Sequence, residues 1–203
     1  QEEIASVFSE RAKQLNAPIT FAEYEVRECF TTDLLGSYQS KNIKGIVAVL
    51  KALKTLQISA SAIKKGLLDV VANTGLKGRW QVLQNQPKII CDTAHNKEGL
   101  SLTMGQLQTE SYEELHIVFG VVADKDLSNI LQILPKQAQY YFCSPDNLRG
   151  LPVTELHAKA IVCGLQGSTY NSVFEALESA KQKAGLSDVI YVGGSTFVVA
   201  EIL

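Results

Sequence analysis

The residues best suited to chemistry follow a short apolar run near the middle of the chain. Residues 87–91 read as a buried strand, which is followed at once by Asp92, His95 and Asn96, and residues 97–107 then suit a helix. In open α/β sheets, ligands bind beyond the carboxyl ends of the strands, where helix amides point into the crevice. The pattern therefore predicts a binding or catalytic loop. The same residue types also have structural roles, since Asp and Asn cap helices and a lone His is common on a surface.

Polar residues also follow three further predicted strands. These groups are Asp124, Lys125 and Asp126; Ser144, Asp146, Asn147 and Arg149; and Gly193, Gly194, Ser195 and Thr196. In a parallel sheet such loops share one edge, so we expect them to converge on one crevice. For Asp126 a helix cap is the favoured role, and for Lys125 and Arg149 a solvated or structural one. Gly193 and Gly194 fit a tight turn and a backbone approach to an anion equally well.

The spacing of apolar residues predicts two regions of different secondary structure. The first holds helices over residues 2–15 and 42–56 and from Ser59 onward, with Ser61 as an alternative cap of the last. It also holds a strand over 18–24 and an undecided strand or loop over 25–36. The second alternates strands (79–83, 87–91, 115–122, 139–143, 188–192) with helices (97–108, 127–134, 153–162, 171–184, 196–203). Gly185 is expected to close the helix over 171–184 in a left-handed conformation. The alternation predicts an α/β fold with a parallel, doubly wound sheet, and a domain boundary near residue 74.

Composition narrows the class of protein. The chain has 203 residues, of which 46% are apolar and 20% charged, with a formal charge of −2. Nothing in it favours nucleic acid, and no apolar run predicts a membrane span or a signal peptide, so we expect a cytoplasmic protein. The four cysteines are far apart, which favours reduced packing thiols over disulfides or zinc. Because the chain starts at Gln1 without an initiator Met, we expect a piece of a longer protein.

Several common reaction types lack their motifs. There is no G-x-G-x-x-G after a strand, no G-x-S-x-G, and no G-x-x-x-x-G-K-[ST]. The chain is therefore not expected to hold a triphosphate in a P-loop by itself. Cys91 and His95 straddle a strand and a loop, which is poor geometry for a metal, so no metal site is predicted in these residues.

A series of ordered segments resembles the folylpolyglutamate synthase and dihydrofolate synthase family of the Mur ligase superfamily. Gly78-Arg79-Trp80-Gln81 and Asp92-Thr93-Ala94-His95-Asn96 are similar to the family's paired GRFQ and D-x-AHN segments. Leu35-Gly36-Ser37-Tyr38-Gln39 with Asn42, the Asp124-Lys125-Asp126 loop, and the closing Tyr191 to Ser195 with Glu201 agree in order. Tyr38 stands where the family usually has His, and Trp80 where it usually has Phe.

The resemblance implies a fold and a reaction. Residues 1–73 would close a Mur-ligase-type ATP-binding domain, and residues 74–203 would form the Rossmann-like glutamate ligase domain. The family activates a carboxylate of folate or dihydropteroate with ATP as an acyl phosphate, which the amine of L-glutamate then attacks. The P-loop and the Mg²⁺ ligands would lie N-terminal to Gln1, so these 203 residues alone would be inactive. The partners are small molecules, and a monomer is expected.

The resemblance also implies roles for single residues. Arg79, Asp92 and Asn42 match positions of nucleotide contact, and a guanidinium suits the charge of a phosphate. His95 is assigned to catalysis or glutamate binding, and Ser195 to glutamate binding.

An alternative remains, in which the chain is a non-catalytic α/β binding or regulatory module. The pocket that selects the folate acceptor is not identified by these residues. We expect a hinge over residues 73–78.

Overall fold

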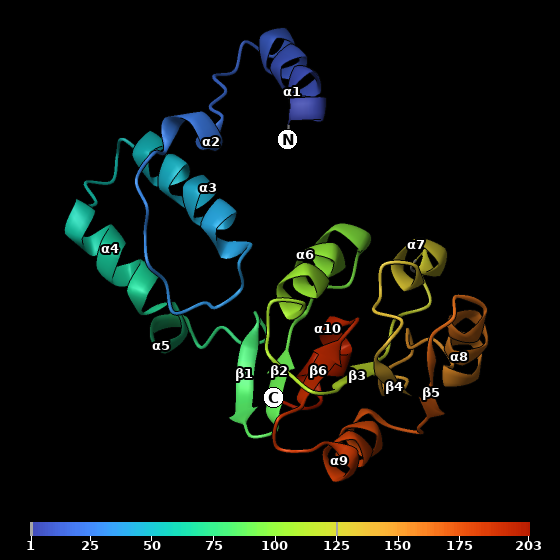
Figure 1. Ribbon diagram of the computed structural model, residues 1–203. Coiled ribbons are helices and arrows are strands. Elements are labelled where there is room, and N and C mark those ends of the chain that lie inside the picture. Colours follow the sequence, from blue (N-terminus) through green and yellow to red (C-terminus); the bar gives the residue numbers. More distant parts are fainter. Residues whose placement is uncertain (1, 125) are drawn as a thin grey trace. The chain divides into compact units, whose positions relative to one another are not determined.

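The computed structural model describes residues 2–124 and 126–203, and the chain divides into two compact units (Figure 1). One unit holds the residues up to Asp33 together with Tyr38–Asp69, and the other holds Leu34–Ser37 together with Val70–Leu203. This division lies close to the boundary expected near residue 74. The assignment of the two parts to an ATP-binding and a glutamate ligase domain stays a prediction.

The regular secondary structure of the first unit consists of helices alone among its described residues. Its helices are α1 (Glu2–Gln14), α2 (Ala22–Glu25), α3 (Gln39–Ala52) and α4 (Ala60–Leu68). Val26, Ile43, Val47 and Leu67 form a small buried core. The predicted start of α4 is confirmed, since the Ser59 hydroxyl accepts the Ala62 N–H at 3.1 Å.

One predicted element of this unit is wrong. Residues 18–24 were expected as a strand, but residues 17–21 have no regular structure and the short helix α2 follows. A strand needs a neighbouring strand to satisfy its backbone groups, and the described residues of this unit supply none.

The second unit is built around a six-stranded sheet. Its strands are β1 (Gln81–Asn85), β2 (Lys88–Cys91), β3 (Leu115–Phe119), β4 (Gln139–Phe142), β5 (Gln166–Thr169) and β6 (Val189–Gly193), in the order β1-β2-β6-β3-β4-β5. Its helices are α5 (Val70–Thr74), α6 (Lys97–Leu107), α7 (Leu127–Leu131), α8 (Val153–Val162), α9 (Val173–Lys183) and α10 (Thr196–Ala200). The strands other than β1 are all parallel to one another, in the spatial order β2, β6, β3, β4 and β5. The predicted α/β fold is confirmed.

Alternation along the strands divides the apolar side chains between two layers. Ile90, Ile117 and Tyr191 point to the side covered by α6, α7 and α8. Their sequence neighbours, such as Val118 and Ile190, pack beneath α9 and α10 on the other side. The layers can be followed in Figure 1. Because both faces are covered, the central strands are mostly apolar, with His116 as a buried polar residue in β3.

Three expectations for this sheet are corrected. The first concerns β1, which is antiparallel to β2, so the sheet is not wholly parallel. Only Gln86 and Pro87 separate the two strands, which is too short a connection for a parallel crossover.

The second correction concerns the ends of helices. Gly185 does not adopt a positive φ, because α9 ends at Ala184 in an extended conformation and the Gly185 N–H donates to the Asp188 carboxylate at 2.7 Å. Left-handed glycines follow two other helices: Gly75, with φ of 66°, follows α5, and Gly164, with φ of 80°, follows α8.

The third correction is the strand β5, which the sequence did not predict. It forms the free edge of the sheet beside β4, and its side chains are mostly exposed. β5 is a strand because its backbone pairs with β4. Its mostly exposed side chains form no apolar pattern from which the sequence could predict a strand.

A short segment from the first third of the chain belongs to the second unit. The Gln106 side chain on α6 donates to the Leu35 carbonyl at 3.0 Å and accepts the Ser37 N–H at 2.6 Å. These two bonds hold the backbone of residues 34–37 against α6, which explains why the segment clusters with the sheet. No helix among the described residues has the length and apolar character to cross a membrane.

Cys29 is exposed, whereas Cys91 at the end of β2 and Cys143 after β4 are buried, as expected for packing thiols. Burial, assisted by the Asp92 charge at Cys91 and the Glu201 charge at Cys143, raises the pKa of each of these thiols to about 12. Both are therefore protonated at neutral pH.

We predict that a thiol reagent at pH 8 modifies exposed Cys29 in the native chain and leaves Cys91 and Cys143 unmodified. A raised thiol pKa keeps the unreactive, protonated form up to a pH well above 8, and burial blocks access. Peptide mass spectrometry after labelling in buffer and in denaturant would check this. Equal labelling of Cys91 and Cys29 in buffer would contradict it.

Candidate functional site

The carboxyl ends of four parallel strands meet at one edge of the sheet. There the Asp92 N–H donates to the Val192 carbonyl at 3.2 Å, and the Gly120 N–H donates to the Gly193 carbonyl at 3.3 Å. The Cys143 N–H donates to the Phe119 carbonyl at 3.0 Å. The predicted convergence of these strand ends is confirmed for their backbones.

The antiparallel direction of β1 brings the Gly78-Arg79-Trp80 turn to this same edge. Gln81 at the start of β1 pairs with Cys91 at the end of β2. The Thr93 N–H then donates to the Gly78 carbonyl at 3.0 Å, so the turn and the loop after β2 lie side by side. A parallel β1 would have placed Arg79 at the opposite edge.

Asp92 joins the turn to the loop. One carboxylate oxygen accepts the Trp80 N–H at 2.7 Å, and the other accepts the Ala94 N–H at 2.8 Å. Asp92 is only 2% exposed, so these charge-assisted bonds form away from water. Asp92 therefore holds the backbone of the turn against the backbone of the loop.

The turn that Asp92 holds has an unusual backbone conformation. Trp80 has a φ of 48°, which L residues with large side chains rarely adopt and which costs about 1–3 kcal/mol. Gly78 has a φ of 69°, and a Cβ there would come within 2.8 Å of the Thr93 methyl group. Trp80 accepts this conformation because its buried indole packs beside Tyr191 and its N–H bonds to Asp92.

Arg79 is held between these two neighbours and is half-buried. Its Nη1 donates to the Gly78 carbonyl at 3.2 Å and to the Thr93 hydroxyl. A guanidinium carries five N–H donors, more than these two contacts use. The turn therefore presents an oriented cation at the ligand-binding edge of the sheet.

His95 and Asn96 play different parts in the loop. Asn96 is the N-cap of α6, with its side-chain oxygen accepting the Gly99 N–H at 2.8 Å. His95 is exposed, and its Nδ1 lies 3.0 Å from the Thr93 carbonyl. Because a carbonyl only accepts, Nδ1 carries the proton of the neutral ring, and Nε2 is then the acceptor.

Ser195 and the two glycines before it form a compact entrance to α10. The Ser195 hydroxyl accepts the Phe197 N–H at 3.2 Å, and Ser195 is 2% exposed. Gly194 has a φ of 94°, and a Cβ there would lie 2.6 Å from the Gly120 carbonyl oxygen. These contacts favour the tight-turn interpretation of the glycine pair.

The remaining sequence candidates have separate locations. Arg149 pairs with Asp124 at 2.6 Å in an exposed salt bridge, which fits its expected structural role. Asp126 precedes α7, but its carboxylate accepts from the Asn129 side chain and makes no capping bond to the backbone. Lys125 lies outside the described residues. Asn42 is exposed on α3 of the first unit, where its amide donates to Gln39 at 3.0 Å.

Sequence reasoning missed Thr93 as the residue that orients Arg79. A threonine inside a loop carries no distinguishing pattern, and its contact with Arg79 depends on the pairing of β1 with β2. Cys91 does not suit a metal, because a raised pKa disfavours the thiolate.

Residues 78–196 match the profile of the Mur ligase glutamate ligase domain, which covers more than half of the chain. The chain belongs to the Mur ligase family. The matched region begins at the Gly78 turn and ends at the first residue of α10, so it spans the whole edge described above.

Three individual relatives show which Mur ligases this chain is similar to. A probable bifunctional folylpolyglutamate synthase/dihydropteroate synthase of Haloferax volcanii is 33% identical over 171 residues, or 83% of this chain and 20% of its own length. A Yersinia pestis folylpolyglutamate synthase/dihydrofolate synthase complexed with AMPPNP and Mn is 25% identical, with a TM-score of 0.68, over 85% of this chain and 40% of that one. A structure of such an enzyme with Mn, AMPPNP and L-glutamate bound is 28% identical, with a TM-score of 0.66, over 77% and 36%.

The Mur ligase relatives are much longer than this chain. The chain spans 20%, 33% and 37% of the length of the first three curated relatives that it matches. The similarity therefore concerns only a part of each of those proteins.

We predict that Asp92→Ala lowers the free energy of unfolding of the second unit by about 2–4 kcal/mol, because two buried N–H groups lose a charged acceptor. Trp80 is the one tryptophan of the chain and is 2% exposed, so its fluorescence should shift to the red in the same variant. Denaturant unfolding followed by tryptophan emission measures both effects.

Asp146→Ala, which alters an exposed carboxylate of another strand-end loop, is the control and should change stability by less than about 0.5 kcal/mol. Wild-type stability and emission in Asp92→Ala would show that Asp92 does not hold the turn.

Proposed function

We propose that this chain is the glutamate ligase portion of an ATP-dependent ligase that joins L-glutamate to folate or dihydropteroate. The observation that carries the proposal is the oriented Arg79 guanidinium at the carboxyl edge of a sheet that belongs to the Mur ligase glutamate ligase domain. A half-buried cation in this position suits a substrate that carries phosphate.

The names of the relatives support the class of reaction. They are folylpolyglutamate and dihydrofolate synthases, and solved relatives were obtained with AMPPNP, Mn and L-glutamate. An ATP analogue, a divalent metal and glutamate are the components expected for ATP-driven amide formation. We propose Mg²⁺ as the physiological metal.

The proposed chemistry has two steps. A carboxylate oxygen of the folate or dihydropteroate attacks the γ-phosphorus of ATP, giving an acyl phosphate and ADP. The glutamate amine then attacks the acyl carbon, phosphate leaves, and an amide remains. Both steps move negative charge between phosphate oxygens, so a fixed guanidinium can stabilise each transition state without reorganising.

Arg79 is the residue to which we assign this role. Its Nη1 bonds to Gly78 and Thr93 orient the plane of the guanidinium before any ligand binds, and this lowers the entropy lost on binding. A lysine would supply the charge but not the planar fork that pairs two N–H groups with one phosphate.

We propose that Asp92 and Asn42 also contribute to the nucleotide site, in unlike ways. Asp92 is buried and accepts two backbone N–H groups, so its main contribution is to position Arg79. Asn42 is exposed and carries both a donor and an acceptor, the combination that an adenine edge requires.

For glutamate we propose His95 and Ser195. His95 is exposed with Nε2 as the acceptor, which can receive a hydrogen bond from the substrate ammonium group or amine. Ser195 is buried at the start of α10, where its hydroxyl accepts the Phe197 N–H and keeps its own hydrogen for donation.

Asp92 belongs to no group of potential metal ligands among the residues that the structure describes. The group of three described residues that could surround a metal ion lies at the opposite edge of the sheet. We therefore propose that the Mg²⁺ of the reaction is held by residues outside the second unit, where it would neutralise the phosphate charge.

We predict that Arg79→Ala in the intact ligase lowers kcat about 10²–10³-fold, as expected when one fixed donor to a developing anion is removed. Arg79→Lys should recover only part of this loss, because the ammonium group cannot reproduce the bidentate geometry. Steady-state kinetics with ATP, glutamate and folate would measure both effects.

Lys77→Ala is the matched control for a nearby cation, since Lys77 is exposed and its ammonium group donates to the Leu203 carbonyl at 3.2 Å. Unchanged Trp80 emission would show that the turn is intact. A wild-type rate in Arg79→Ala would remove Arg79 from the mechanism.

We predict that His95→Gln raises KM for glutamate about tenfold and leaves KM for ATP close to the wild-type value. The expected size corresponds to one lost hydrogen bond to a charged partner. His157→Gln on α8, which alters a histidine bonded to the Gly167 carbonyl, is the matched control. An equal change in both KM values would place His95 outside the glutamate site.

A further inference from the structure

Three potential metal ligands lie at the amino ends of the strands, opposite the edge that carries Arg79. Glu114 immediately precedes β3, His116 is its second residue, and Asp188 immediately precedes β6. Glu114 and His116 are two residues apart, so their side chains point to the same side of the sheet. The parallel pairing of β3 with β6 brings Asp188 beside them, with Leu115 opposite Val189.

The distances match a small coordination sphere. The Nε2 atom of His116 lies 3.3 Å from an oxygen of Asp188, and one ligand atom from each of the three side chains lies within 4.8 Å of the others. Two ligands of a tetrahedral ion with bonds of about 2.0–2.1 Å are separated by about 3.3–3.4 Å. The histidine and aspartate already have this separation, and the exposed Glu114 side chain needs only a rotation to complete it.

The two inner ligands are held in place by neighbouring groups. Asp188 accepts the Glu114 N–H at 2.9 Å and the Gly185 N–H at 2.7 Å. The Nδ1 of His116 lies 3.0 Å from the Tyr141 hydroxyl. A partner on the second ring nitrogen fixes the ring and its tautomer, as is usual for metal-binding histidines.

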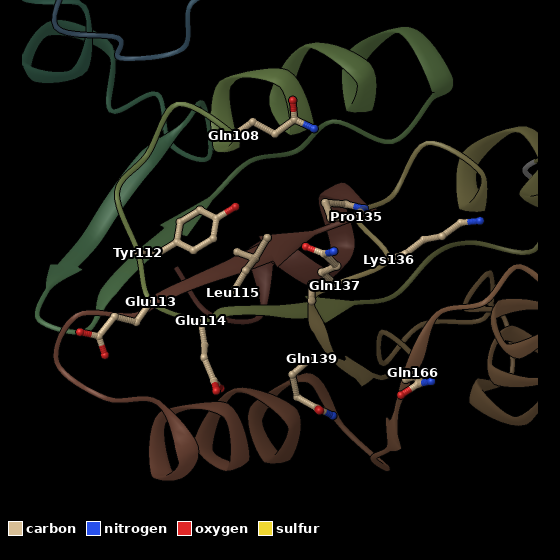
Figure 2. A pocket seen from close by; sticks show the side chains of 11 residues that line it. Gln108, Tyr112, Glu113, Glu114, Leu115, Pro135, Lys136, Gln137, Gln139 and Gln166 are labelled. Carbon is tan, nitrogen blue, oxygen red and sulfur yellow. The ribbon is translucent and has the colours of Figure 1, made fainter.

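A polar opening leads to the ligands. Glu114 lines a cavity of about 770 Å³, and Asp188 lines a second one of about 510 Å³ beside it. Figure 2 shows the Glu114 carboxylate turned toward α9, with Leu115 on the other side of the strand. Glu113 lies on the walls of both cavities, and its charge favours the entry of a cation.

Two lysines lie on elements next to the site, Lys183 on α9 and Lys88 on β2. The Lys183 ammonium group lies 5.6 Å from the centre of the Tyr141 ring, and Lys88 pairs with Glu110. Each of these cations has its own partner. Neither contact involves an atom of Glu114, His116 or Asp188.

We propose that Glu114, His116 and Asp188 form a Zn²⁺ site, with water as the fourth ligand. One imidazole and two carboxylates favour zinc over Mg²⁺ or Ca²⁺, which prefer oxygen ligands alone. The bound ion would tie the amino end of β3 to that of β6 and stabilise the sheet. The ion would take no part in the chemistry proposed for Arg79, because the two sites lie at opposite edges of the sheet.

The test is a zinc titration of the chelator-treated 203-residue chain by calorimetry, with Co²⁺ absorption as a second readout. We expect one ion per chain, and a rise in the thermal midpoint of about 5 °C at saturating zinc. Glu114→Gln should weaken binding at least about tenfold, and because Glu114 is exposed this variant keeps the fold.

Two controls separate this site from other ways of binding zinc. Glu113→Gln, which removes the adjacent carboxylate of the same cavities, should change the affinity less than about twofold. A variant with both Cys29→Ser and His95→Gln should still bind one ion. The proposal is overturned if the wild-type chain shows no saturable binding, if Glu114→Gln binds like the wild type, or if either control abolishes binding.

Discussion

The bond from the Trp80 N–H to the buried Asp92 carboxylate is the contact on which the candidate site depends. It joins the first residues of an antiparallel edge strand to the loop that follows the adjacent strand. Without it the left-handed backbone of Trp80 has no compensation, and Arg79 loses its fixed position beside Thr93. A charged acceptor that is 2% exposed is suited to this task, since competing water is excluded.

The sheet of the second unit has two edges at which we propose ligand sites. Its central strands are buried on both faces, so side chains within them serve packing, and chemistry is confined to the ends of the strands. Arg79, Asp92, His95 and Ser195 lie at the carboxyl edge, whereas Glu114, His116 and Asp188 lie at the amino edge. Ligands at the two edges can therefore be studied separately.

Several residues that resemble family motifs also hold one another. Asp92 accepts backbone N–H groups, Asn96 caps α6 and Ser195 caps α10. These bonds explain why the motif residues occur as groups around the strand ends. Arg79 is half-buried and His95 is exposed, so both side chains reach the surface at this edge.

The sequence by itself determined the features that depend on local pattern. The apolar run before Asp92, the cap at Ser59 and the alternation of strands and helices after residue 74 predicted the α/β fold and the loops of the candidate site. These features could be predicted because each depends on neighbours within one or two turns of the chain.

Only the tertiary structure decided the features that depend on pairing between distant residues. It reversed β1 and so placed Arg79 beside Thr93 and Asp92, added β5 as an edge without an apolar pattern, and gave the left-handed position to Gly164 in place of Gly185. It also brought Glu114 and His116 to Asp188, more than seventy residues away along the chain. The physical reason is that backbone pairing and the contacts of buried polar groups are satisfied by the whole sheet, which no local stretch of sequence specifies.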